Sequence, residues 1–345
     1  MSNIGIIGAG AWGIAIAKLL ENNGHKLTIF SAITSEIDML KEFNELTDKL
    51  PGTILSQETK YTTDIEEAVK DKDILILAVA SPYTKKTSAL MAPFIKDGQI
   101  IVNVSKGIDD ESLMTLSEVI ESQIPNANVC VMSGPSHAEE VAKGLPTTIV
   151  VGSKNKDSAL LLQEVFMSDV FRVYISSDVK SIELGAALKN VVALAAGIAD
   201  GLGYGDNTKA ALITRGIAEI TRLGIVMGGR IETFYGLTGI GDLIVTCASV
   251  HSRNRRAGIL IGQGMSYEEA TKEVKQVVEG VYAARAGLAL AKKYNVNVPI
   301  IEEVNKILFE NANPADAVKE LMERERKVEN IDLRELYKNA TDIPW

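Results

Sequence analysis

Residues 3–24 read NIGIIGAGAWGIAIAKLLENNG, which is an apolar strand pattern, a glycine turn and a helical pattern in direct succession. The turn places Gly8, Gly10 and Gly13 in a GxGxxG spacing. Between a strand and a helix, such glycines allow a tight turn, a close approach of the backbone to a pyrophosphate and close helix–strand packing. The first N–H groups of the helix then face the phosphates. The alternative is an ordinary glycine turn without a ligand, but this context favours a dinucleotide-binding loop.

Downstream of this loop, short apolar runs alternate with helical patterns. We expect strands at residues 3–8, 26–31, 73–79, 99–105, 128–134, 147–153 and 170–176. We expect helices at residues 12–23, 34–46, 64–70, 83–95, 110–122 and 156–167. Strands that are apolar on both faces are typical of parallel sheets covered by helices. The pattern therefore predicts an α/β fold with a doubly wound, Rossmann-type parallel sheet.

The pattern changes near residue 178. From there to about residue 325 the sequence is helical in period, punctuated by glycines, and has no convincing strand. We therefore predict a dinucleotide-binding domain at residues 1–180, an all-α substrate and catalytic domain at 181–328, and a peripheral C-terminal tail at 329–345.

Composition limits the classes of function. The chain has 345 residues, of which 46% are hydrophobic, and 36 basic against 45 acidic residues give a formal charge of −9. A net-acidic chain is not typical of a nucleic-acid or membrane-surface binder. The two cysteines and three histidines form no zinc-type spacing, so we expect no metal and a reducing, cytoplasmic location.

Membrane insertion and secretion are not expected either. Lys189, Asn190 and Asp200 interrupt the longest apolar run, which predicts that it does not span a membrane. The N-terminus enters a strand pattern at once and has no basic region ahead of an apolar one, so we expect no signal peptide.

The end of the second predicted strand leaves the cofactor type open. An acidic residue at this point binds the ribose hydroxyls of NAD, whereas an arginine accommodates the 2′-phosphate of NADP. The sequence FSAITSE (30–36) has Ser31 and Ala32 there, with Glu36 further along. We therefore expect NAD or NADP as cofactor without a preference.

A lysine interrupts the most apolar helical pattern of the second half. Residues 182–203 read IELGAALKNVVALAAGIADGLG, with Asn190 as the polar neighbour of Lys189. Burial lowers the pKa of an ammonium group toward neutrality, where it can both give and take a proton during reduction of a ketone. The alternative is a lysine whose head reaches water at the edge of the helix.

Further polar stretches lie where ligands bind. Lys106 and the run SGPSHAEE (133–140) each follow a predicted strand, at the edge where open α/β sheets bind ligands. The alternatives are a solvated lysine and a helix start capped by Ser136. The run GLTGIGDLIVTCASVHSRNRR (236–256) carries Asp242 and arginines. Arginine can donate two parallel hydrogen bonds to a phosphate, although a short basic run is also typical of a solvated face. In QVVEG (276–280), Glu279 could reach a ribose or cap a helix.

Taken in order, these motifs resemble those of the NAD(P)-dependent glycerol-3-phosphate dehydrogenases, and the bacterial soluble type is the most similar. The resemblance covers roughly residues 3–325 and rests on GAGAWG, NVSKGI, SGPSHAEEVAKGLPT, LGAALKNVVALAAGIADGLGYGDNTKAALITRG, GLTGIGDLIVTC, SRNRR and QVVEG. The block at 184–216 and SRNRR are specific to this family, whereas the glycine loop alone is not.

The resemblance implies a role for each matching residue. It makes Lys189 the catalytic acid/base, Lys106 a second lysine that touches substrate and cofactor, and Asp242 the carboxylate that positions Lys189 and the substrate. Substrate contacts are also expected at Gly134, Ser136, Thr246, Ser252, Arg253 and Asn254. Cofactor contacts are expected at Gly8, Gly10, Ala11, Trp12, Gly13, Ala138, Arg253, Val277 and Glu279. The family often has a basic or imidazole side chain near Ala32, and this chain departs from that pattern.

The resemblance also implies the chemistry. Lys189 is expected to protonate the carbonyl of dihydroxyacetone phosphate while NADH or NADPH delivers hydride, which gives sn-glycerol 3-phosphate for phospholipid synthesis. Arg253 and Asn254 are expected to hold the phosphate. A homodimer is expected, with neither a nucleic-acid partner nor stable membrane insertion.

Two alternatives have to be weighed against this hypothesis. A β-hydroxyacid or 6-phosphogluconate-type dehydrogenase also pairs a Rossmann domain with a helical domain and a lysine on the linking helix, but SRNRR and GLTGIGDL argue against it. A cofactor-sensing protein without catalysis would keep the glycine loop, yet it has no need for Lys189, Lys106 and Asp242 together.

Overall fold

The computed structural model describes residues 1–325, which form two compact units. Unit 1 consists of residues 1–106 and 116–179, and unit 2 consists of residues 107–115 and 180–325. Residues 107–115 were expected in the first domain, but Ile108 lies in the hydrophobic core of unit 2. The predicted tail at 329–345 lies outside the described residues.

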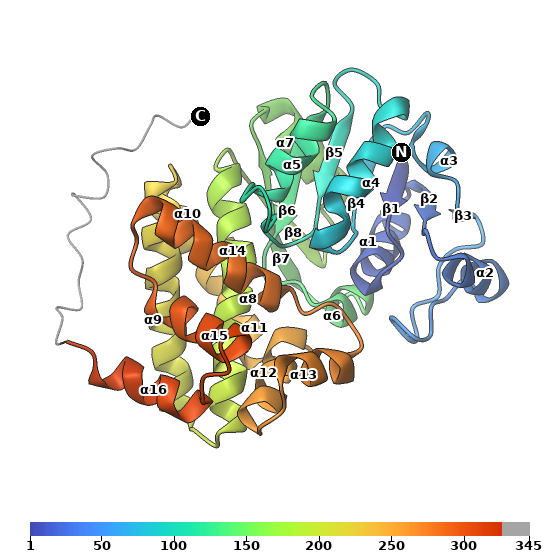
Figure 1. Cartoon of the computed structure of the whole chain (residues 1–345). Helices are drawn as coiled ribbons and strands as arrows, with labels where there is room; N and C mark the ends of the chain where they lie inside the picture. The colour runs from blue at the N-terminus through green and yellow to red at the C-terminus, as the bar shows by residue number, and fades with distance from the viewer. Residues whose placement is uncertain (326–345) are drawn as a thin grey trace. The chain divides into compact units, whose positions relative to one another are not determined.

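Unit 1 is built on an eight-stranded sheet with the strand order β3-β2-β1-β4-β5-β6-β7-β8 (Figure 1). The seven predicted strands are confirmed, with ends shifted by at most two residues, and one more strand is present. The strands are β1 (Asn3–Ile7), β2 (Lys26–Phe30), β3 (Lys60–Thr62), β4 (Ile74–Leu77), β5 (Ile100–Asn103), β6 (Asn128–Ser133), β7 (Thr147–Ser153) and β8 (Phe171–Ser176).

Two features of the sheet differ from the prediction. Strand β3 is only three residues long and begins with an exposed lysine, so its sequence has no apolar run to reveal it. Strand β7 pairs antiparallel with β6, whereas a fully parallel sheet was expected. A parallel neighbour needs a crossover over one face of the sheet. The β6–β7 connection contains only the five-residue helix α6 (Ala138–Ala142) and turns back instead.

Helices cover both faces of this sheet. Ile74 and Ile76 of β4 lie in one apolar cluster, and Leu75 and Leu77 lie in another. Because successive side chains of a strand point to opposite faces, the sheet is buried on both sides. The predicted helix at 110–122 begins later, at Leu116, and the helix start considered within residues 133–140 is the five-residue α6. The other helices of unit 1 are α1 (Ala11–Asn22), α2 (Thr34–Phe43), α3 (Ile65–Val69), α4 (Thr84–Met91), α5 (Leu116–Gln123) and α7 (Lys156–Phe166), with 3₁₀ turns at Ser81–Tyr83 and Ala92–Phe94.

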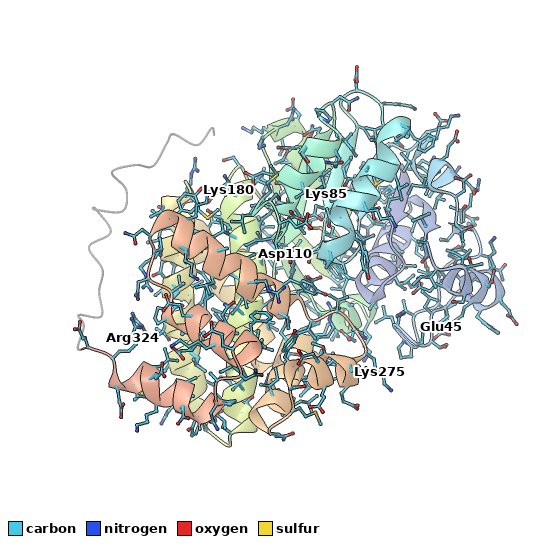
Figure 2. The ribbon with its side chains drawn as sticks, viewed as in Figure 1. Glu45, Lys85, Asp110, Lys180, Lys275 and Arg324 are labelled. Carbon is cyan, nitrogen blue, oxygen red and sulfur yellow. The ribbon has the colours of Figure 1, made fainter. Side chains whose placement is uncertain are left out.

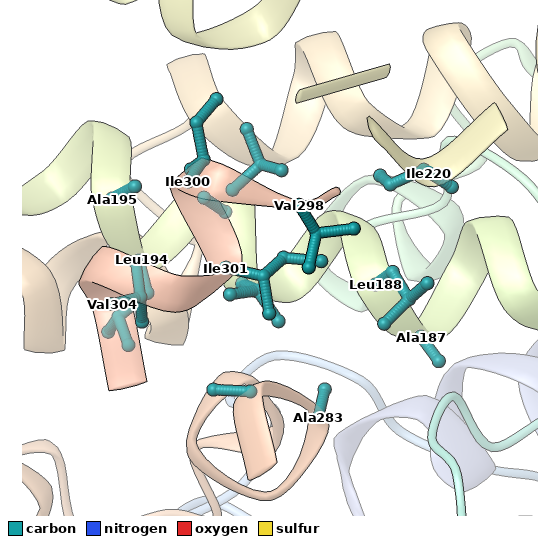
Figure 3. Close-up of a cluster of buried hydrophobic side chains, with 14 of the residues drawn as sticks. Ala187, Leu188, Leu194, Ala195, Ile220, Ala283, Val298, Ile300, Ile301 and Val304 are labelled. Atoms are coloured by element: carbon teal, nitrogen blue, oxygen red, sulfur yellow. The ribbon is translucent and has the colours of Figure 1, made fainter. Parts of the chain in front are cut away.

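Residues 180–325 of unit 2 contain helices and no strand, as predicted. Its elements are α8 (Val179–Gly201), α9 (Asp206–Val226), α10 (Ile231–Phe234), a π-helical turn η3 (Leu237–Gly241), α11 (Asp242–Ala248), α12 (Arg253–Gly262), α13 (Tyr267–Val274), α14 (Glu279–Tyr294), α15 (Pro299–Phe309) and α16 (Pro314–Glu323). The core gathers side chains from several of them around α8. Figure 3 shows Leu188 and Leu194 of α8 together with Ile220 of α9, Ala283 of α14 and Ile301 of α15.

Helix α8 is buried along its length. By length and composition alone it passes as a possible membrane span in spite of Lys189, Asn190 and Asp200, the residues from which the sequence predicts that it does not span a membrane. However, its most apolar 18-residue window is 100% buried in the structure. A helix that is hydrophobic all round is buried in protein or in a membrane, and here protein covers it.

Glycines bring α8 and α12 into backbone contact. A Cβ added at Gly197 of α8 would lie 2.1 Å from the carbonyl oxygen of Arg255, and one added at Gly258 of α12 would lie 2.2 Å from that of Leu194. Real Cβ atoms do not approach so closely. Only glycine therefore permits this spacing, which holds the first turn of α12 against α8.

Candidate active site

The ammonium group of Lys189 is buried and held by two oxygen atoms from α11. Its Nζ donates to Asp242 Oδ1 at 2.5 Å and to Thr246 Oγ1 at 2.6 Å. Lys189 is only 4% exposed and Asp242 only 1%. The alternative of a lysine reaching water at the helix edge is therefore wrong. By contrast, Lys85 and Lys275, which are labelled in Figure 2, are exposed.

The local sequence explains how Asp242 reaches Lys189. Gly185 lies one helical turn before Lys189 on the same face of α8, and a Cβ there would lie 2.9 Å from the carbonyl oxygen of Thr238 in η3. Gly239 packs still more closely, since a Cβ there would lie 1.9 Å from the carbonyl oxygen of Phe234. Turns of π-helix are frequent at functional sites, and this one ends directly before Asp242. The close contacts at Gly185 and Gly239 thus place the carboxylate at the start of α11, beside the lysine.

Thr246 completes this group from the next turn of α11. Its hydroxyl donates to the backbone oxygen of Asp242 at 2.6 Å and accepts from Lys189. Because the hydroxyl hydrogen points to the Asp242 carbonyl, a lone pair of the oxygen faces Lys189 and holds the ammonium group in place. We refer to Lys189, Asp242 and Thr246 as the lysine triad.

A second polar link joins three segments that are distant in sequence. Asn254 Nδ2 donates to Asn190 Oδ1 at 2.9 Å, and Asn254 Oδ1 accepts from the backbone N–H of Gly280 at 2.8 Å. Asn190 is the neighbour of Lys189 on α8 and was given no role in the sequence analysis. The only signal for it was a second polar residue inside an apolar helix.

The basic run 252–256 divides between surface and interior. The Ser252 hydroxyl caps α12 by accepting from the N–H of Arg255. Arg253 is exposed and Asn254 is buried. Arg255 forms an ion pair with Asp200 at 2.7 Å, and Lys209 pairs with the other oxygen of that carboxylate at 3.0 Å. The interpretation of this run as a wholly solvated face is therefore wrong for Asn254 and Arg255.

The remaining unit 2 residues lie next to Asn254 in the fold. Val277 is half-buried just before α14, and Glu279 is the first residue of α14 and 9% exposed. Because Gly280 bonds to Asn254, the QVVEG stretch and the SRNRR stretch meet at one place.

In unit 1, the glycine loop has the geometry of a phosphate cradle. Gly8 has a φ of +121°, and a Cβ on it would lie 2.6 Å from the carbonyl oxygen of Ala78. A Cβ on Gly13 would lie 2.1 Å from Gly8 O, so α1 packs tightly against the turn. By contrast, a Cβ on Gly10 meets nothing within 4 Å, and no side chain caps α1 there.

These features fit a dinucleotide. The first N–H groups of a helix lack partners within the helix and attract anions. Ala11 and Trp12 supply two of them at the start of α1. Trp12 also has a buried indole Nε1 without a hydrogen-bond partner among residues 1–325.

Lys106 and the 134–138 segment lie at the same edge of the sheet as the glycine loop. Lys106 follows β5 and Gly134 follows β6, and both strands run parallel to β1 in the order β1-β4-β5-β6. Lys106 Nζ and Ser136 Oγ each donate to the carbonyl oxygen of Gly134 at 3.0 Å. Ser136 is not the cap of α6, which begins at Ala138 after His137. The ligand edge of this fold therefore carries these side chains.

Other chemistries find less support in the described residues. Burial raises the pKa of the Cys247 thiol to about 12 and that of Cys130 to about 11, so neither is poised as a thiolate nucleophile. Within residues 1–325, no group of three or more His, Cys, Asp or Glu side chains is placed to hold a metal ion.

The chain is similar to known proteins over almost its whole length. The family described as NAD-dependent glycerol-3-phosphate dehydrogenase N-terminus matches residues 3–159, and its C-terminus counterpart matches residues 178–319. A glycerol-3-phosphate dehydrogenase [NAD(P)+] of Agathobacter rectalis is 62% identical over 96% of this chain and 99% of its own, and one of Bacillus subtilis is 46% identical over 98% and 99%.

A solved structure is also similar over nearly its whole length. The glycerol-3-phosphate dehydrogenase of Coxiella burnetii superposes with a TM-score of 0.91 at 36% identity, covering 94% of this chain and 99% of that one. The chain therefore belongs to the NAD(P)-dependent glycerol-3-phosphate dehydrogenase family of oxidoreductases.

Proposed function

We propose that this chain reduces dihydroxyacetone phosphate to sn-glycerol 3-phosphate, reversibly, with Lys189 as the general acid and base. The observation that carries the proposal is the buried ammonium group, which is held by Asp242 and Thr246 within a dehydrogenase fold. A lone buried charge is costly, so a lysine kept in an apolar helix calls for a functional reason.

Lys189 gives a proton to the carbonyl oxygen of the substrate as that oxygen gains negative charge, and it takes the proton back in the reverse direction. General acid–base catalysis of this kind contributes about 10²- to 10⁴-fold. Asp242 and Thr246 act as positioning residues, because two hydrogen bonds fix where the ammonium lies. Asp242 also orients the substrate hydroxyl.

The start of α12 binds the substrate phosphate in this proposal. Arg253 supplies a fork of N–H donors, and Asn254 is held in one orientation by Asn190 and Gly280. The N-terminus of α12, capped by Ser252, adds positive dipole. A phosphate fixed there brings the carbonyl to the lysine, and such orientation lowers the barrier.

The glycine loop binds the cofactor through Gly8, Gly10, Ala11, Trp12 and Gly13. When bound, NADH or NADPH supplies the hydride that reaches the carbonyl carbon. Lys106 stabilises the developing alkoxide, and Gly134 and Ser136 touch the substrate. Ala138, Arg253, Val277 and Glu279 complete the cofactor contacts.

The proposal extends to the cellular setting. The enzyme acts in the cytoplasm as a homodimer, uses no metal, and binds neither nucleic acid nor membrane. Its product feeds phospholipid synthesis. The relatives that carry the name glycerol-3-phosphate dehydrogenase support this assignment.

A substrate panel tests the proposed function. NADH or NADPH oxidation is followed with dihydroxyacetone phosphate, with dihydroxyacetone, and with a 3-oxo acid. The expected result is rapid oxidation with the phosphate ester and a loss of about 10²-fold or more in kcat/KM without the phosphate, since the phosphate fixes the carbonyl. Faster turnover of the 3-oxo acid would assign the chain to hydroxyacid chemistry instead.

A further inference from the structure

A serine and a glutamate are joined at the carboxyl end of β2. Ser31 directly follows β2 and is 4% exposed. Its Oγ donates to Glu36 Oε2 at 2.5 Å and accepts from the N–H of Ile33 at 3.1 Å. The N–H of Gly8 donates to Phe30 O at 2.9 Å, so this strand end lies beside the glycine loop. The pair, called here the Ser31–Glu36 pair, is therefore next to the cofactor cradle.

The charge around this pair is not suited to a second phosphate. The other carboxylate oxygen of Glu36 lies 3.7 Å from Lys49 Nζ, which makes a neutral ion pair. The sequence contains no arginine before Arg172. Arg172 lies on β8, at the far edge of the sheet from β2. Within unit 1, a guanidinium fork is therefore absent from the β2 side of the sheet.

We propose that Glu36, positioned by Ser31, makes this protein selective for NADH over NADPH. The proposal rests on the proposed function. In this fold the adenosine ribose lies at the end of the second strand, where a carboxylate can accept a hydrogen bond from the 2′-hydroxyl. A 2′-phosphate in the same place brings about two negative charges against that carboxylate. No arginine compensates for them, and the nearby Lys49 is already paired with Glu36, so NADPH binds more weakly.

The position of Glu36 differs from that of the acidic residue that usually binds the ribose at the end of the second strand. Glu36 belongs to the first turn of α2 instead of the strand end itself. The Ser31 hydroxyl bridges the gap by holding the carboxylate back toward β2. Ser31 is thus a positioning residue, and its loss should weaken the selectivity without removing the charge.

Cofactor binding to the full-length protein tests this inference without turnover. NADH and NADPH are titrated at one fixed ionic strength, and binding is followed by nicotinamide fluorescence. The wild type should bind NADH about 10-fold or more tightly than NADPH. Glu36→Gln should reduce that ratio by about 5-fold or more, mainly by tightening NADPH, and Ser31→Ala should reduce it less. Glu42→Gln, an exposed glutamate on the same helix, is the control and should keep the wild-type ratio.

The outcomes separate this inference from the proposed function. Equal binding of the two cofactors, tighter NADPH binding, or an unchanged ratio in Glu36→Gln overturns the role of Glu36, even if dihydroxyacetone phosphate is reduced. The expected ratios without turnover of that substrate support the inference and contradict the proposed function. Binding of neither cofactor overturns both. Circular dichroism of each variant identifies a failure to fold, and Ser31→Ala then serves as the second variant.

Discussion

At the scale of single residues, Asp242 is the most informative position of the lysine triad. Replacing it with asparagine keeps the shape and one hydrogen bond but removes the charge that holds the ammonium group. We expect Asp242→Asn to lower kcat by about 10²-fold. Cofactor affinity should stay within a few-fold of wild type, because Asp242 is proposed to contact Lys189 and the substrate and not the cofactor.

Steady-state kinetics and a fluorescence titration of NADH check this prediction. Thr246→Ser is the matched control, because serine keeps the hydroxyl that accepts from Lys189. That variant should retain kcat within a few-fold. Equal losses in both variants would argue against a special role for the Asp242 carboxylate.

The ion pair also predicts a pattern in stability. Removing one partner leaves the other charge buried and unpaired, which costs about 3–5 kcal/mol. We expect Lys189→Met and Asp242→Leu each to lower the free energy of unfolding by this amount. The double variant should be more stable than either single variant. Urea unfolding gives the three free energies of unfolding. Losses that simply add in the double variant would mean that the two groups do not interact.

The sequence predicted part of the site at this scale. A lysine within an apolar helix suggested a buried ammonium group, and its burial is confirmed. The link between Asn190, Asn254 and Gly280 was not predicted, because it joins residues 64 and 26 positions apart through the folding of three helices. Hydrogen bonds between distant helices of this kind produce no periodic pattern in the sequence.

At the scale of elements, the glycine contact between α8 and α12 sets the position of Asn254. Gly258→Ala places a methyl group against the carbonyl oxygen of Leu194 and forces the helices apart. We expect a loss of about 1–3 kcal/mol in the free energy of unfolding, together with a raised KM for dihydroxyacetone phosphate.

Urea unfolding and kinetics measure both effects. Gly241→Ala is the control, since its backbone is already helical and an added Cβ makes only ordinary contacts. Its stability should be unchanged or slightly raised. If Gly258→Ala is as stable as Gly241→Ala, the close helix crossing is not required.

The start of α15 provides a prediction about pH. The buried carboxylate of Glu219 accepts from the N–H groups of Ile300 and Ile301. Burial raises the pKa of Glu219 to about 7, against the lowering effect of these hydrogen bonds, from an ordinary value of 4.5. The folded state therefore holds this proton more tightly than the unfolded state. The resulting stabilisation is fully present below pH 4.5 and is lost as the pH rises through 7.

Comparison with Glu219→Gln isolates this effect, because glutamine does not titrate. Between pH 5 and 8, the free energy of unfolding of the wild type should fall relative to that of the variant, by up to about 3 kcal/mol. Glu302→Gln, in the first turn of α15, is the control. Its free energy of unfolding should change with pH as that of the wild type does. A difference between wild type and Glu219→Gln that is constant with pH would contradict the assignment.

The elements themselves were largely predictable, and the exceptions have physical causes. Apolar runs with β-branched residues gave the seven longer strands. Strand β3 was not predicted, because three residues are too few to form a recognisable apolar pattern. The direction of β7 was missed because the apolar pattern of a strand says nothing of its orientation; only the short connection between β6 and β7 decides that.

At the scale of the whole molecule, the proposed reaction draws on both units. The glycine loop, Lys106 and Gly134 belong to unit 1, and the lysine triad with the start of α12 belongs to unit 2. The chain passes from one unit to the other directly after Lys106. The sequence predicted two domains with these two roles. It did not predict that residues 107–115 belong to the helical unit. A segment of nine residues is too short to differ recognisably in composition from its neighbours in the sequence.

The most direct test is the absorbance at about 340 nm, the band of the reduced nicotinamide, with dihydroxyacetone phosphate and NADH or NADPH, for the wild type and Lys189→Ala. Our account predicts oxidation by the wild type and a loss of about 10²-fold or more in the variant, which should still bind the cofactor. Turnover by Lys189→Ala within a few-fold of wild type would contradict the role of the lysine. No turnover by a folded wild type that binds the cofactor would contradict the proposed reaction itself.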